Sequence, residues 1–311
     1  MNPPFSAIFL TTLIGAGQGL FLMLFGTELW LPDGASAEGH VFFASAAAVS
    51  LVFTGGGLLA SLFHLGQPQR AWRGMTMWRT SWLAREGLAL PAFMMGDFCY
   101  AALHFMGSPA TLWVGAITAI LCLTLFICTG MIYVCIRFLQ EWASPLTLVN
   151  YLLLGCASGA VLASALAAFW APGLVPLYGP LAVLLTLAGL ATRTASLLRN
   201  ASLRPKSNLQ TAIGIKHPRI VQKAQGFMGG SFNTREFFHG RGAPLLRSVK
   251  WGFLALAFVL PVLCVSLGVV NGTPALLAMA FVVQYVGLLA ERWFFFAQAN
   301  HPQNLYYQTI S

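Results

Sequence analysis

The chain has 311 residues, of which 58% are hydrophobic and only 8% are charged, with 17 Lys and Arg against 8 Asp and Glu. Soluble domains are about one quarter charged, so this composition excludes a chain that buries its apolar side chains inside one water-soluble globule. The formal net charge of +9 does not indicate nucleic-acid binding, because the basic residues are dispersed between long apolar segments instead of forming one patch.

Eight apolar segments of membrane-spanning length follow one another along the chain. The first is too long for the apolar core of a signal peptide and no basic residue precedes it, so we expect a retained span. We interpret Pro91, Pro180 and Pro261 as kinks within spans. The predicted spans are Phe5–Trp30, His40–Leu65, Trp82–Met106, Thr111–Phe138, Leu146–Trp170, Leu174–Leu198, Val249–Val270 and Thr273–Gln298. The predicted fold is therefore an all-α integral membrane bundle of about eight helices, with residues 1–311 forming one domain.

The basic residues predict how this bundle is oriented. The connections after the second, fourth and sixth spans carry nearly all of the Lys and Arg, whereas the connection from Asp33 to Glu38 carries none. Basic connections face the cytoplasm. We therefore expect a multi-pass protein of the bacterial cytoplasmic (inner) membrane with both termini in the cytoplasm and a long basic cytoplasmic connection at 200–248.

Cysteine and histidine spacing argues against a metal centre in this chain. The six cysteines lie in apolar segments, and none forms a C-x-x-C motif, so we predict no iron–sulfur cluster. A haem would need two histidines at matching depth on neighbouring helices. Only His40 and His104 approach this, while His64 lies at the opposite end of its span, so haem is disfavoured.

Four polar residues within or at the ends of spans are candidates for function. Gln18 lies among glycines in the first span, where it could contact a ligand or bond to a neighbouring helix. Asp97 lies deep in the third span, where a carboxylate must be paired, protonated or in a wet cavity. His64 closes the second span and Glu86 opens the third. An imidazole and a carboxylate at similar depth suit proton exchange, although such groups are also common as solvated helix ends.

The connection that holds these two residues resembles a known family. The run from His64 to Ala71 (HLGQPQRA), Trp72, and the SWL and REG runs at 81–83 and 85–87 closely resemble the connection between helices two and three in membrane-anchor subunits of the dimethyl sulfoxide reductase type, within the polysulfide-reductase-like superfamily. The eight spans and the ERWFF run at 291–295 agree with that family. The segment 209–239 is similar to the branch paired with sulfite-oxidising molybdenum enzymes.

The resemblance implies an oxidoreductase complex of three subunits. A molybdopterin subunit would perform the substrate chemistry, an iron–sulfur subunit would transfer electrons, and this anchor, without substrate catalysis of its own, would exchange them with ubiquinone or menaquinone. His64 would hydrogen-bond to the quinone and Glu86 would relay protons. Arg70 or Trp72 would shape the pocket, and Gln18 would form part of its wall.

The basic connection between the sixth and seventh spans is the expected docking surface for the soluble, ferredoxin-like iron–sulfur subunit. It is longer than most loops and mixes glycine, aromatic and basic residues. We expect docking on the cytoplasmic face, because His64 and Glu86 lie on that side. The alternative is an amphipathic segment on anionic lipid. The residues expected to contact the partner are Lys216, Arg219, Phe227, Phe232, Arg235 and Phe237.

Two other functions stay open at this point. The chain could anchor a reductase of dimethyl sulfoxide or of another S- or N-oxide, and would then oxidise menaquinol. It could also be a multi-span transporter. Transporters are typically built from repeats whose broken helices meet at mid-membrane, and only the glycines at 55–57 fit such a break.

Overall fold

The computed structural model describes residues 1–311 except 32–36, 64–66, 222, 224–236, 303 and 305–311. Eight of its helical segments are long and apolar enough to cross a membrane, which confirms the predicted all-α membrane bundle. The helices are α1 (Phe5–Trp30), α2 (Ala37–Leu62), η2 (Pro68–Arg70), α3 (Ala71–Met75), α4 (Trp82–Phe105), α5 (Thr111–Val134), α6 (Pro145–Trp170), η3 (Pro172–Leu174), α7 (Val175–Ala201), α8 (Leu209–Ile213), α10 (Ala243–Leu254), η4 (Ala255–Val259), α11 (Leu260–Val270) and α12 (Pro274–Gln298).

Two predicted boundaries differ from the structure by several residues. The fourth span was expected to reach Phe138, but α5 ends at Val134 and Cys135, its C-cap, is exposed. Hydropathy does not detect this end, because the turns that follow are themselves rich in apolar residues. The seventh span begins at Ala243, since Pro244 favours the first turn of a helix and the turn carrying Arg247 is still helical.

The kink expected at Pro261 takes the form of a π-helical turn. Proline cannot donate a backbone hydrogen bond, and its ring would clash with the carbonyl of residue 257 in a regular α-helix. The wider turn η4 precedes Pro261 and relieves this conflict. Helix α12 packs closely on the turn, since a Cβ at Gly287 would lie 2.2 Å from the Ala257 nitrogen.

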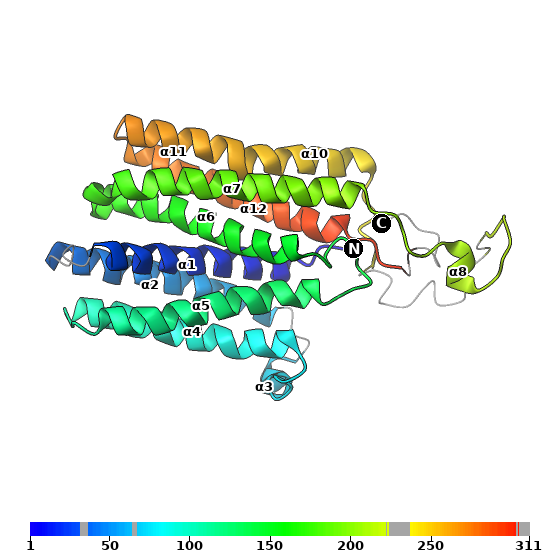
Figure 1. Cartoon of the computed structure of the whole chain (residues 1–311), viewed down its shortest axis with the longest axis horizontal. Helices are drawn as coiled ribbons and strands as arrows, with labels where there is room; N and C mark the ends of the chain where they lie inside the picture. Colours follow the sequence, from blue (N-terminus) through cyan, green and yellow to red (C-terminus); the bar gives the residue numbers. More distant parts are fainter. Residues whose placement is uncertain (32–36, 64–66, 222, 224–236, 303, 305–311) are drawn as a thin grey trace.

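The bundle consists of two groups of helices. Helices α1, α2, α4 and α5 lie together, and α6, α7, α10–α11 and α12 form the other group (Figure 1). Helices α1 and α6, the two most buried spans, cross between the groups at glycines. A Cβ at Gly19 would lie 1.9 Å from the Gly155 oxygen, and one at Gly159 would lie 2.0 Å from the Gly19 carbonyl carbon. The two backbones therefore meet almost directly, as small residues allow in membrane proteins.

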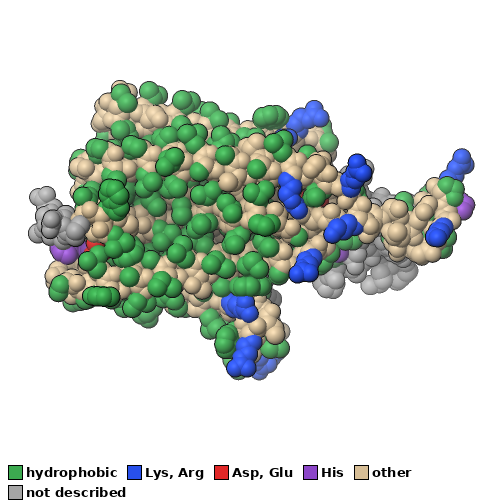
Figure 2. Space-filling model, in the orientation of Figure 1, with side chains coloured by type: hydrophobic (Ala, Val, Ile, Leu, Met, Phe, Trp, Pro, Cys, Tyr) green, Lys and Arg blue, Asp and Glu red, His purple; other side chains and the backbone are tan. Residues whose placement is uncertain are grey.

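Charge is unevenly distributed between the two ends of the bundle. The N-terminus, α3, α8 and the last described residues lie at one end (Figure 1). The lysines and arginines gather at the same end (Figure 2), which we call the basic end. The opposite end carries Glu28, His40 and His104.

The glycine crossing makes a prediction about stability. Gly159→Ala puts a methyl group into the α1 backbone, so we expect it to destabilise the protein by about 2 kcal/mol and to lower its apparent melting temperature in detergent. Gly252→Ala is the matched control, because no atom lies within 4 Å of a Cβ there. Equal melting temperatures for the two variants would contradict the close approach.

Candidate functional site

Glu86 lies in the second turn of α4 and points into the bundle. Helix α4 begins after Ser81, whose Oγ accepts a hydrogen bond from the Ala84 nitrogen at 3.3 Å. The Glu86 side chain is 7% exposed, and Thr129 on α5 donates a hydrogen bond to its Oε1 at 2.5 Å. Among the described residues no Lys, Arg or His forms an ion pair with it. A desolvated carboxyl without a cation is suited to accept and release a proton.

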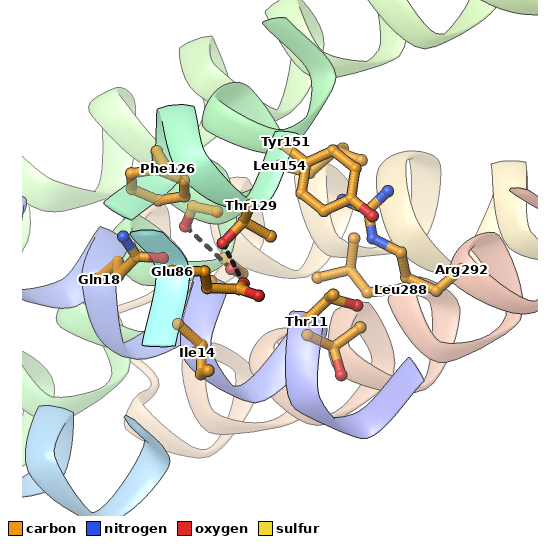
Figure 3. A pocket seen from close by; sticks show the side chains of 14 residues that line it. Thr11, Ile14, Gln18, Glu86, Phe126, Thr129, Tyr151, Leu154, Leu288 and Arg292 are labelled. Carbon is orange, nitrogen blue, oxygen red and sulfur yellow. Dashed lines mark hydrogen bonds between the residues drawn. The ribbon is translucent and has the colours of Figure 1, made fainter. Parts of the chain in front are cut away.

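A small cavity surrounds this carboxyl, and we call it the Glu86 pocket (Figure 3). It has room for about one or two water molecules and lies a few turns inside the basic end. Polar atoms and apolar side chains share its wall. Its lining residues are Thr11, Thr12, Ile14, Gly15, Gln18, Glu86, Phe126, Thr129, Tyr151, Leu154, Gly155, Ser158, Leu288 and Arg292.

Gln18 bonds to a neighbouring helix and also faces the pocket. Its Nε2 donates a hydrogen bond to the Cys122 carbonyl oxygen on α5 at 2.9 Å, and the residue lines the Glu86 pocket. The amide is almost fully buried. Gln18 therefore ties α1 to α5 beside the carboxyl of Glu86.

A buried ion cluster adjoins the pocket, formed by Arg193, Glu291 and Arg292. The Arg193 Nε lies 2.7 Å from Glu291 Oε1, and Arg292 Nη1 lies 3.5 Å from Glu291 Oε2. The guanidinium of Arg292 stacks on Tyr151, 3.7 Å from the ring centroid. All three residues are at most 5% exposed, so each charge depends on its partners for solvation.

The sequence alone did not predict this cluster. The charge pattern assigns the lysines and arginines to the connections at the basic end, but Arg193 and Arg292 are buried inside the bundle, on α7 and α12. The ERWFF run at 291–295 could have indicated the cluster. It places Glu291 and Arg292 next to each other in an apolar span, where charged residues are costly unless they are paired inside the bundle.

The other expected quinone-site residues lie elsewhere. Arg70 on η2 and Trp72 on α3 are exposed, and neither lines the Glu86 pocket. Helix α3 nevertheless packs beside α4, since a Cβ at Gly87 would lie 3.6 Å from Met75 Cγ. His64 lies outside the described residues.

The expected docking residues are described only in part. Lys216 and Arg219 are exposed and follow α8, which extends beyond the bundle at the basic end (Figure 1). Phe237 stacks on His301 with ring centroids 4.0 Å apart. Burial lowers the pKa of His301 below its usual range, because the imidazolium loses solvation. Phe227, Phe232 and Arg235 lie outside the described residues.

A second group of polar side chains lies towards the opposite end. The Nδ1 atoms of His40 and His104 are 3.0 Å apart, and Tyr100 donates a hydrogen bond to Glu28 Oε2 at 2.7 Å. Asp97 lies deeper and accepts a hydrogen bond from Ser50 at 2.7 Å. None of these residues lines the Glu86 pocket.

Comparisons with known proteins agree with this architecture. Residues 1–297 match the family described as DMSO reductase anchor subunit (DmsC). The chain is also 50% identical over 325 residues to a protein from Allochromatium vinosum that is named as a subunit of sulfite dehydrogenase, and the match covers 100% of both chains.

Proposed function

Since the chain belongs to the DMSO reductase anchor subunit family, we propose that it is the quinone-reactive membrane anchor of a molybdopterin and iron–sulfur complex that oxidises sulfite. We infer sulfite as the substrate from the name of the relative that is 50% identical to this chain. Electrons from a soluble iron–sulfur subunit would pass to ubiquinone or menaquinone in the membrane, and the molybdopterin subunit would oxidise sulfite to sulfate. This chain would provide the quinone site.

The observation that carries the quinone proposal is the buried carboxyl of Glu86. Reduction of a quinone consumes two electrons and two protons, so the site needs a proton donor within an apolar surrounding. Glu86 supplies a carboxyl group that can carry a proton, and it shares its pocket with the apolar side chains of Ile14, Phe126 and Leu288.

The neighbouring residues receive separate roles in this proposal. His64 would donate a hydrogen bond to one quinone carbonyl, as the family resemblance implies, and Glu86 would protonate the other. Arg292 would stabilise the negative charge that develops on the ring oxygen. Gln18 would hold α1 against α5 at the wall of the pocket.

The quinone ring is larger than the Glu86 pocket, so its place needs a separate argument. The pocket accommodates about one or two water molecules, enough for a carbonyl edge only. We propose that the ring lies on the side of the connection containing Arg70 and Trp72, because Met75 of that connection packs beside Gly87.

We also propose that the iron–sulfur subunit docks on the basic end. Lys216 and Arg219 are exposed there, and the Glu86 pocket lies nearer to this end, which would shorten the distance for electron transfer. Phe227, Phe232, Arg235 and Phe237 would add apolar and basic contacts. Under the positive-inside rule this end faces the cytoplasm, so we place both termini and the soluble subunits there.

Glu86→Gln tests the quinone site. We expect it to lower quinone-linked sulfite turnover at least about 100-fold, as is typical when an acid–base group is removed, and His64→Ala to act in the same direction. Reduction of a soluble dye by sulfite stays unchanged, because it bypasses the membrane. Asp97→Asn is the control, a buried carboxyl on the same helix outside the pocket. Wild-type quinone turnover in assembled Glu86→Gln complexes would refute the site.

Deletion of residues 208–239 tests the docking surface. We expect the molybdopterin and iron–sulfur subunits to appear in the soluble fraction while the anchor stays in the membrane. The charge reversal Lys216→Glu with Arg219→Glu should weaken attachment in a salt-dependent way. Lys216→Arg with Arg219→Lys, which keeps both positive charges, is the matched control. Full retention of both subunits after the deletion would remove the docking role.

Cysteine labelling tests the orientation. Ser207 lies at the basic end and Ser108 in the connection between α4 and α5 at the opposite end, and both are partly exposed. In a background where the exposed Cys135 is replaced by Ser, Ser207→Cys should react with a membrane-impermeant maleimide only after permeabilisation. Ser108→Cys should react in intact spheroplasts. The reverse pattern would invert the proposed topology.

A further inference from the structure

We propose that protons reach the Glu86 pocket from the basic end through a polar route between α6, α7 and α12, and that Glu291 is the positioning and relay residue on this route. The inference rests on the proposed quinone function and adds the path of its protons. In the proposed reaction, quinone takes up two electrons from the iron–sulfur subunit and two protons from the aqueous phase and becomes quinol.

Three cavities follow one another from the surface to Glu86. The surface groove includes Glu141, Asn200, Arg204 and Lys206. The intermediate cavity shares Glu141 and Asn200 with this groove. It also shares Arg292 with the Glu86 pocket. Each cavity therefore has a wall residue in common with the next.

Polar side chains line the intermediate cavity along its depth. Asn150 Nδ2 donates a hydrogen bond to Ser196 Oγ at 2.7 Å, and Thr192 Oγ1 donates one to Asn150 Oδ1 at 2.8 Å. Asn150 and Ser196 line this cavity and are buried. These hydroxyl and amide groups are tolerated inside an apolar bundle because they are hydrogen-bonded to one another, and they provide the hydrogen-bonding partners that a proton path requires.

The ion cluster stands between the intermediate cavity and the Glu86 pocket. Two arginines and one glutamate give it a formal charge of +1, counted from Arg193, Glu291 and Arg292. The contact from Glu291 to Arg193 is tight at 2.7 Å, whereas the contact to Arg292 is loose at 3.5 Å. An anionic ring oxygen in the Glu86 pocket would attract Arg292 and weaken this loose contact. The Glu291 carboxylate could then accept a proton from the intermediate cavity and release it towards the Glu86 pocket, returning to its ionised form.

Apolar side chains separate Glu86 from the next carboxyl on α4. The next carboxyl on α4 is Asp97, about 16 Å from Glu86 along the helix axis. Leu90 and Phe93 lie between them on the same helix, are buried, and pack in the main apolar core. Arg292, the arginine that lines the Glu86 pocket, also lines the intermediate cavity and so connects the pocket with the basic end.

Asn150→Leu tests the route in the reconstituted complex of all three subunits. Leucine keeps the branched shape of asparagine but cannot form its hydrogen bonds. We therefore expect the kcat of quinone reduction to fall about tenfold, which is less than the loss expected when an acid–base group itself is removed. The KM for quinone and the reduction of a soluble dye by sulfite stay unchanged. A small permeant proton donor such as imidazole should restore the rate, and the solvent isotope effect should increase. Ser196→Ala should show a weaker form of the same pattern.

Gln284→Met is the matched control, because Gln284 is a buried amide on α12 that bonds to Thr186 and lies outside all three cavities. Unchanged turnover in Asn150→Leu, or a loss that imidazole does not restore and that raises KM, would overturn the route. If Glu86→Gln is slow while Asn150→Leu is normal, the route alone fails. If Glu86→Gln is also normal, the proposed quinone site fails.

Discussion

The near contact of the α1 and α6 backbones is the constraint on which the rest of the bundle depends. Gly19, Gly155 and Gly159 let the two helix groups meet without intervening side chains. Gly15 and Gly155 also line the Glu86 pocket. The same absence of side chains that permits close packing therefore leaves a small space beside the carboxyl of Glu86. Packing and the candidate site share one cause.

Much of the architecture is encoded in simple sequence signals. Apolar length and breaker residues predict eight spans, and α1 matches its predicted bounds, Phe5–Trp30. The charge pattern also predicts which connections share an end. The fine boundaries do not follow from hydropathy. Apolar residues occupy the turns after Val134, and a proline-started helical turn precedes the apolar part of the seventh span.

The candidate site was predictable only in part, for a physical reason. Glu86 and Gln18 stand out because each is a polar residue within an apolar segment, and the structure brings both to one pocket. The place of Arg292 depends on helices α6 and α7, which are far away in sequence. Arg292 stacks on Tyr151 of α6, and its neighbour Glu291 pairs with Arg193 of α7. Single-sequence periodicity carries no information on such a contact. Arg70 and Trp72 lie close to Glu86 in sequence but on an exposed segment.

The buried ion cluster also bears on how the protein enters the membrane. Helix α12 carries Glu291 and Arg292 side by side, and charged residues within a membrane span are costly during insertion by the translocon. The compensating charge is Arg193, on α7. Since α7 is synthesised before α12, Arg193 is already in the bilayer when the last helix inserts. The cluster thus makes completion of the bundle a cooperative event, in which the final span is retained best when the sixth is already in place.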